Sequence, residues 1–268
     1  MNKIWIGNGQ LVLPDKIVPG GSVLLEGKKI AAVNVPCPPD ARRVDVDGSY
    51  IMAGFVDLHV HGGGDSDFMD EDASAFPTIA KAHCAHGTTA LCPTTMTCAD
   101  SLLEKTIDLF LEADKEPENG AELLGLHLEG PYFSAASKGA QPIGEQRIPE
   151  REDLERILRR AKGSILRWDA APELPNMELF AKVMAENGVL ASLAHSAATA
   201  PEALRAFDWG FSHVTHFYNA CTTFHKKNGL VYSGIVEATY LRDDVTIELI
   251  GDGRHIPRES MLLALRIK

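Results

Sequence analysis

From residue 51 onward, apolar runs of strand length alternate with amphipathic runs of helical length, and this alternation constrains the fold more than any other feature. Strands are predicted by the runs at 54–59, 88–94, 122–128, 165–171, 190–195, 212–217 and 246–250. Helices are predicted at 73–86, 99–113, 151–160, 177–187, 201–208 and 257–267. Such alternation is typical of a parallel sheet with helices outside it, so we expect an α/β fold of the TIM-like (β/α)8 barrel type.

The number of strands and the first fifty residues set the expected domain boundaries. The alternating region holds about seven strand–helix units, whereas a closed barrel of this class needs eight. Residues 1–50 contain four strand-like runs separated by glycine-rich turns, at 3–7, 10–13, 22–26 and 29–33. We therefore expect part of a small β-sandwich domain at 1–50. At 51–268 we expect a barrel domain that lacks its last strand because the chain is C-terminally truncated.

Residue types that bind metal ions stand where the predicted strands end. His59 and His61 close the first strand of the barrel region and lie two residues apart, so both side chains share one face. Glu129, His195 and His216 each end a later apolar run. Because the C-terminal ends of parallel strands converge on one face of a barrel, we expect these five side chains to meet there. Imidazole and carboxylate groups suit a divalent metal such as zinc, which predicts a metal-dependent hydrolase.

Each of these residues also has a plainer explanation. An isolated His-x-His pair is more often part of a polar loop, and Glu129 could instead form a salt bridge at the barrel mouth. His127 shares a strand face with Glu129 and either supports a metal ligand or is a buried core histidine. His213 lies three residues before His216 and so points to the opposite face of its strand, which favours a structural role.

Charge and cysteine content exclude other functions. The chain has 26 Lys and Arg against 37 Asp and Glu, and its net charge of -11 argues against a nucleic-acid partner, which would require a basic face. The five cysteines form no Cys-x-x-Cys pair, which favours a reduced, cytoplasmic setting. The N-terminus lacks a signal-peptide core, and no apolar run approaches the ~20 residues of a membrane span, so we expect no membrane partner.

Six segments, in order along the chain, carry a family resemblance: GFVDLHVHG, LGLHLEGPYFS, KGAQP, LAHSAAT, VTHFYNA and GDGRH. The chain resembles the N-acetylglucosamine-6-phosphate deacetylases of the amidohydrolase superfamily over its whole length. The resemblance implies hydrolysis of the acetamide of N-acetylglucosamine 6-phosphate to glucosamine 6-phosphate and acetate, a step of amino sugar catabolism. It also implies one or two divalent ions, with zinc as first choice and Fe²⁺, Mn²⁺ or Co²⁺ as alternatives.

The same resemblance assigns roles to individual residues. It implies that Glu129, His195 and His216 bind the metal, and that His59 and His61 hold a second ion. It implies that the amino sugar phosphate is bound by Ala140, Asn219, Ala220, Lys226 and His255. In the family the last two residue positions come from a partner subunit, which implies a homodimer.

Three departures from the family pattern stand out. Lys226 occupies the place of a loop arginine, and a lysine holds phosphate without the bidentate fork of arginine. Gln141 stands where the family often has histidine. The catalytic aspartate of the family is expected roughly two dozen residues after Asp252, beyond residue 268, so no catalytic residue is assigned within the chain.

Two other functions stay open at this stage. A cyclic amidase such as a dihydroorotase or hydantoinase would bridge two metals with a carboxylated lysine. No lysine stands at a comparable strand end, where Glu129 takes that place. The other alternative is an inactive metal-binding fragment or pseudoenzyme, because the strand-eight aspartate is expected outside the chain.

Overall fold

The computed structural model describes residues 3–142 and 144–268, and the chain divides into two units, Met1–Phe55 and Val56–Lys268. The first unit is a five-stranded sheet made of β1 (Lys3–Val12), β2 (Ile17–Glu26), β3 (Lys29–Val33), β4 (Arg42–Asp45) and β5 (Tyr50–Ile51). β1 pairs antiparallel with β2 and parallel with β4 and β5. Leu11, Val23 and Ile51 form the small core of this unit.

The sequence predicts two strands where the structure has the single strand β1. Gly7, Asn8 and Gly9 were expected to form a turn, but the strand continues through them with a shift in its pairing to β2. Asn8 takes a φ of 62°, which an asparagine tolerates, so the local kink is a bulge within one strand.

The second unit contains the predicted alternation of strands and helices. Within the described residues its curled parallel sheet has seven strand positions, in the order β6 (Phe55–Val60), β9 (Thr88–Thr95), β11 (Leu126–Tyr132), β12 (Ile165–Ala170), β13 (Leu190–Leu193), β14 (His213–Val214) and β17 (Thr246–Ile247). The short β10 (Glu122–Leu123) pairs with β9 just before β11. This sheet is that of an incomplete TIM barrel, so the predicted fold class is confirmed.

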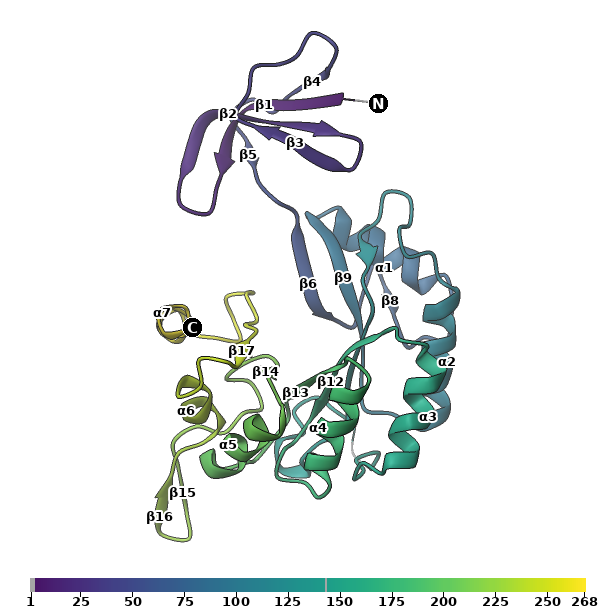
Figure 1. Cartoon of the computed structure of the whole chain (residues 1–268), viewed down its shortest axis with the longest axis vertical. Coiled ribbons are helices and arrows are strands. Elements are labelled where there is room, and N and C mark those ends of the chain that lie inside the picture. The colour runs from purple at the N-terminus through teal and green to yellow at the C-terminus, as the bar shows by residue number, and fades with distance from the viewer. Residues whose placement is uncertain (1–2, 143) are drawn as a thin grey trace. The chain divides into compact units, whose positions relative to one another are not determined.

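Helices surround the strands of this unit on the outside, as Figure 1 shows. They are α1 (Ala75–Cys84), α2 (Asp100–Glu112), α3 (Arg151–Ala161), α4 (Met177–Glu186), α5 (Ala200–Trp209), α6 (Ile235–Tyr240) and α7 (Arg258–Ile267). The start of α5 illustrates the local cause: Thr199 and Glu202 form a capping box around Pro201 in the first turn. Among the described residues, no helix is long and apolar enough to cross a membrane.

Five short elements of the second unit, namely one helix and two pairs of strands, were not predicted. α6 spans six residues, too few for a helical period to be recognised in the sequence. The hairpin of β15 (His225–Lys227) and β16 (Leu230–Tyr232) lies in a segment that was expected to be a loop. The pair β7 (Gly62–Gly63) and β8 (Ser66–Asp67) follows β6 directly and closes the turn that carries His61.

Large aromatic side chains fill the space between the sheet and its helices. Trp168 on β12 is fully buried, and its ring lies 5.9 Å from that of Phe180 on α4. Phe180 in turn stacks on Phe211 at 5.7 Å. Successive side chains of β12 point to opposite faces of the sheet. Trp168 therefore points toward the helices, while its neighbours Arg167 and Asp169 point to the inner side of the sheet, where the candidate site lies.

Candidate metal centre

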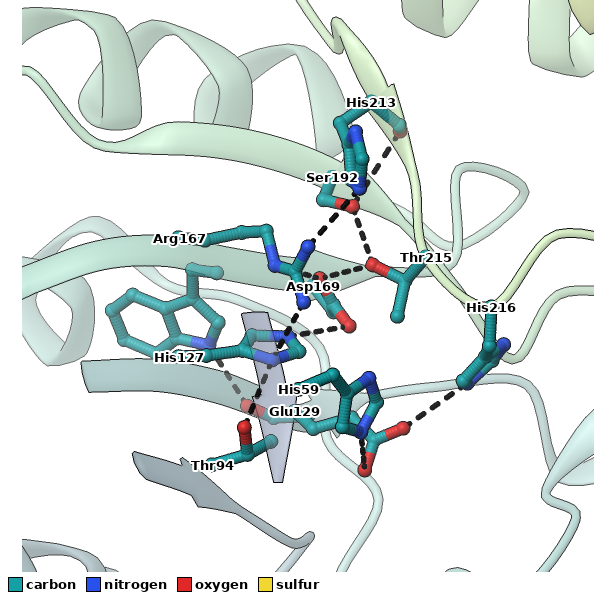
Figure 2. Close-up of polar contacts among 12 residues, drawn as sticks. His59, Thr94, His127, Glu129, Arg167, Asp169, Ser192, His213, Thr215 and His216 are labelled. Carbon is teal, nitrogen blue, oxygen red and sulfur yellow. Dashed lines mark hydrogen bonds and ion pairs between the residues drawn. The ribbon is translucent and has the colours of Figure 1, made fainter. Parts of the chain in front are cut away.

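The five predicted ligands come together at the C-terminal ends of the strands. Glu129 lies within β11, His195 and His216 follow β13 and β14, and His59 and His61 lie at the end of β6. They form two groups that share Glu129, one with His59 and His61 and one with His195 and His216, and in each group the ligand atoms lie within 4.8 Å of one another. Figure 2 shows His59 and His216 pointing toward the Glu129 carboxylate from different strands.

The Glu129 carboxylate bridges the two groups with its two oxygens. Oε1 lies 3.0 Å from Nε2 of His195 and 3.1 Å from Nε2 of His216, and these two nitrogens are 3.1 Å apart. Oε2 lies 3.2 Å from Nε2 of His61 and 3.5 Å from Nε2 of His59, and this second pair of nitrogens is 3.2 Å apart. All four imidazoles therefore present the same ring nitrogen to one carboxylate.

The other ring nitrogen of each imidazole faces a group that can only accept a hydrogen bond. Nδ1 of His195 donates to the carbonyl of Ser137, and Nδ1 of His216 to the carbonyl of Asn219, both at 3.0 Å. Nδ1 of His61 donates to the carbonyl of Thr94, and Nδ1 of His59 to the carboxylate of Glu248, both at 3.2 Å. In the neutral form of each ring, these acceptors assign the proton to Nδ1 and leave the lone pair on Nε2.

This arrangement fits a bound metal. Four nitrogen lone pairs and a carboxylate repel one another at about 3 Å unless a cation lies between them. Metal-bound histidines commonly donate their second ring nitrogen to a carbonyl or carboxylate, as these four do. The residues present therefore suit one or two divalent ions that prefer nitrogen and carboxylate ligands.

The two groups differ in burial. Glu129, His195 and His216 are buried, whereas the side chains of His59 and His61 are 18% and 34% exposed. Burial opposes the charge on Glu129, yet hydrogen bonds from the surrounding histidines hold the pKa of its carboxyl well below the usual range. Burial also opposes the charge on His59, while hydrogen bonds to Glu129 and Glu248 raise its pKa to about 10.

Backbone conformation and one glycine orient the rings of His195 and His216 toward Glu129. His195 and His216 have φ angles of 45° and 33°, in the left-handed region that non-glycine residues enter rarely. These turns end β13 and β14 and direct both rings toward Glu129. The loop that crosses His195 requires Gly139, because a Cβ there would lie 3.0 Å from Cε1 of His195 and the residue has a φ of 56°.

The predicted sugar-binding residues fall into two sets. Ala140 follows Gly139 beside the His195 ring, the carbonyl of Asn219 holds His216, and the carbonyl of Ala220 accepts from the amide of Ser196 at 3.1 Å. Lys226 is exposed on the β15–β16 hairpin, which projects away from the barrel strands in Figure 1. His255 is exposed and paired with Asp252 at 2.8 Å. In the part of the chain that the structure describes, neither Lys226 nor His255 bonds to the metal-ligand groups.

Sequence reasoning missed several residues that support the centre. Gln141, noted only as a departure from the family pattern, is buried and donates to Oε2 of Glu129 at 2.8 Å, while its own carbonyl accepts from the amide of Thr97 at 2.8 Å. Arg167 and Asp169 alternate within the apolar strand β12, and Glu248 follows β17. Charged residues at every second position of an otherwise apolar strand are the signal that could have indicated an ionic barrel interior.

The two histidines with open roles both contact Arg167. Nδ1 of His127 accepts from Arg167 at 2.8 Å, and its Nε2 lies 2.8 Å from Oδ2 of Asp169, a close contact that is not aligned as a hydrogen bond. Burial lowers the pKa of His127 to about 4, so its ring is neutral. His213 is buried and contacts Arg167 at 3.0 Å and Thr246 at 2.8 Å, on the side away from Glu129.

Comparison with known proteins identifies the family to which a chain with this geometry belongs. The model of the amidohydrolase family matches residues 50–264. The N-acetylglucosamine-6-phosphate deacetylase of Lysinibacillus sphaericus is 31% identical over 233 residues, which cover 84% of this chain and 57% of the relative. The N-acetylgalactosamine-6-phosphate deacetylase of Escherichia coli O157:H7 is 28% identical, over 97% of this chain and 64% of the relative. The chain thus spans less than two thirds of the length of either relative.

Solved structures agree with this family. The crystal structure of N-acetylglucosamine-6-phosphate deacetylase from Pasteurella multocida superposes with a TM-score of 0.88 at 27% identity, over 99% of this chain and 69% of that chain. The corresponding enzyme structure from Thermotoga maritima gives a TM-score of 0.78 at 30% identity, over 99% of this chain and 68% of that chain.

Proposed function

Because the chain belongs to the amidohydrolase family, we propose that it hydrolyses the acetamide of N-acetylglucosamine 6-phosphate to glucosamine 6-phosphate and acetate. The observation that carries the proposal is the convergence of four imidazole Nε2 atoms on the Glu129 carboxylate. The choice of substrate is supported by the relatives, several of which are N-acetylglucosamine-6-phosphate deacetylases.

The proposed metal ligands follow from the two groups. Glu129, His195 and His216 would hold the tighter ion, because they are buried and their rings are fixed by backbone carbonyls. His59, His61 and the second oxygen of Glu129 would hold a second, more exposed ion. Zinc is the first choice for nitrogen and carboxylate ligands, with Fe²⁺, Mn²⁺ and Co²⁺ as alternatives. When bound, the ion supplies Lewis-acid polarisation of the acetyl carbonyl and acidifies water at the site.

The protein groups beside this centre would bind and orient the sugar. Asn219 holds the His216 ring through its carbonyl, Ala220 bonds to Ser196 next to His195, and Ala140 follows Gly139, which lies close to the His195 ring; these positions support a role in presenting the acetamide. Lys226 and His255 are proposed to hold the 6-phosphate of a partner subunit's substrate, since both are exposed in elements away from Glu129. This assignment makes the active protein a homodimer, and the five unpaired cysteines support a cytoplasmic setting.

Two measurements test the proposal. Metal analysis of the purified protein should find zinc or a related divalent ion, and this ion should be lost in Glu129→Ala and His195→Ala. The zinc-loaded protein should release acetate from N-acetylglucosamine 6-phosphate faster than from N-acetylgalactosamine 6-phosphate or unphosphorylated N-acetylglucosamine. Full metal content in both variants would refute the ligand assignment, and equal kcat/KM for the phosphorylated and unphosphorylated sugars would refute the phosphate site.

A further inference from the structure

A buried guanidinium lies next to the candidate metal ligands and contacts Glu248. Arg167 on β12 is 6% exposed, and Figure 2 shows its side chain between His127 and His213. Nη1 donates to Oε2 of Glu248 at 2.6 Å and lies 3.0 Å from Nε2 of His213. Nη2 lies 2.8 Å from Nδ1 of His127 and donates to the carbonyl of Leu58 at 3.2 Å. One side chain therefore ties β12 to β6, β11, β14 and the end of β17.

The partner of this guanidinium reaches both groups of metal ligands. While Oε2 of Glu248 is held by Arg167, its Oε1 accepts from Nδ1 of His59 at 3.2 Å. The same Oε1 accepts from the backbone amide of His216 at 3.1 Å. His59 belongs to one ligand group and His216 to the other, so a single carboxylate oxygen contacts one member of each.

We propose that Glu248, oriented by Arg167, is a positioning residue that fixes the ring and tautomer of His59 and so creates the second metal site. The inference rests on the metal centre of the proposed function. Among the four imidazoles, His59 alone has a side chain as its Nδ1 acceptor, whereas the other three donate to backbone carbonyls. A carboxylate that receives the Nδ1 proton leaves Nε2 with the lone pair that a metal requires.

The isosteric change Glu248→Gln separates this role from simple packing. The amide has one acceptor and one donor end, and its NH₂ cannot face the Nη1 donor of Arg167 at 2.6 Å. Because this contact is the shortest that Glu248 makes, we expect the oxygen to face Arg167, which places the NH₂ where Oε1 stood, opposite both the backbone amide of His216 and Nδ1 of His59. There it meets Nδ1 of His59, and two donors cannot face each other, so His59 must take the other tautomer. Its Nε2 then carries a proton in place of the lone pair.

Zinc titration of the full 268-residue chain tests the proposal. The parent should bind two zinc ions, and Glu248→Gln should bind the second one about 10–100-fold more weakly. The first ion should be retained, because the ring of His216 keeps its own Nδ1 partner. Glu237→Gln is the matched control, since Glu237 accepts from Thr223 and from the amides of Phe224 and Gly234 and touches none of the histidines. This control should bind both ions as the parent does.

Long-range ¹H–¹⁵N correlation spectra supply a readout that a merely structural role would not move. In the zinc-saturated parent His59 should carry its proton on Nδ1, and in Glu248→Gln on Nε2. If the Gln variant unfolds, Glu248→Asp keeps the charge but withdraws the carboxylate from His59, and it should show the same loss of the second ion. A second-site affinity within twofold of the parent in the folded variant, or an unchanged His59 tautomer, would overturn the inference.

The outcomes also separate this inference from the function it rests on. A parent that binds one ion overturns the inference and leaves the deacetylase proposal standing. A parent that binds two ions but does not bind the sugar phosphate overturns the substrate and leaves the role of Glu248 standing. A parent that binds no zinc overturns both.

Discussion

Zinc should raise the thermal stability of this chain in steps that follow the two ligand groups, and Glu129→Gln should abolish the whole effect. Glu129 belongs to both groups, so its loss removes a ligand from each site. An ion present at about 100 times its dissociation constant stabilises the folded state by about 2.7 kcal/mol. In a unit of roughly 200 residues, each kcal/mol shifts the unfolding midpoint by about 2–4 °C, so one filled site raises Tm by about 5–11 °C.

The assay is a thermal unfolding scan at increasing zinc, against a chelator-treated reference. His61→Asn should keep the shift from the first site and lose that from the second, because His61 belongs only to the second group. His195→Asn should lose the shift from the first, tighter site. Glu237→Gln should show the same zinc-dependent shift as the parent, whatever its Tm without zinc. If Glu129→Gln rises with zinc as far as the parent does, Glu129 is not the shared ligand and the bridging geometry does not describe the bound state.

Three further predictions follow from individual residues. Because the pKa of His59 is raised to about 10, it is protonated in the metal-free protein below that pH, so the second zinc must displace a proton and its affinity rises with pH. Calorimetry at about pH 8 in buffers of different ionisation enthalpy should show about one proton released, and buffer-independent heats would contradict this. Gly139→Ala should lower the affinity of the first zinc site about 10–100-fold, because the added methyl group displaces the His195 ring. Gly188→Ala is the control, since Gly188 also has a left-handed backbone but faces open space, and it should leave this affinity unchanged. Equal effects of the two changes would refute the steric argument. Thr199→Ala removes the N-cap of α5 and should cost about 1 kcal/mol, seen as a lower Tm with unchanged zinc binding; an unchanged Tm would show that the cap contributes nothing.

The convergence of the three main candidate ligands was predictable because its signal is local. Glu129, His195 and His216 each end an apolar run, and the ends of parallel strands must meet on one face. The split of Glu129 between two groups was not predictable, because it depends on which carboxylate oxygen faces which histidine. The left-handed backbone conformations of His195 and His216 could not be predicted either, because histidine, unlike glycine, does not indicate such a conformation in a sequence.

The supporting residues were missed for a different reason. Arg167 and Glu248 are visible as charges in apolar segments, but they are 81 residues apart and sequence alone does not pair them. The lengths of β14 and β17 were overestimated because the apolar runs continue past the point where the chain leaves the sheet. β14 ends just before the left-handed turn at His216, so the ligand geometry itself shortens the strand.

The charges within the inner side of the sheet explain why the two metal sites should differ in affinity. Despite burial, the pKa of Asp169 is lowered to about 2 by His127 and Arg167, and the pKa values of Glu129 and Glu248 are also lowered by their partners. When the histidines are neutral, as metal binding requires, these three carboxylates and the buried Arg167 together leave a formal charge of -2 before any ion is counted. One divalent ion at the first group neutralises this charge in a low-dielectric setting, where an uncompensated charge is costly. A second ion then brings an excess of two positive charges, which an anionic substrate or hydroxide must offset. The second site should therefore fill after the first, and more readily when a phosphorylated or otherwise anionic ligand is present.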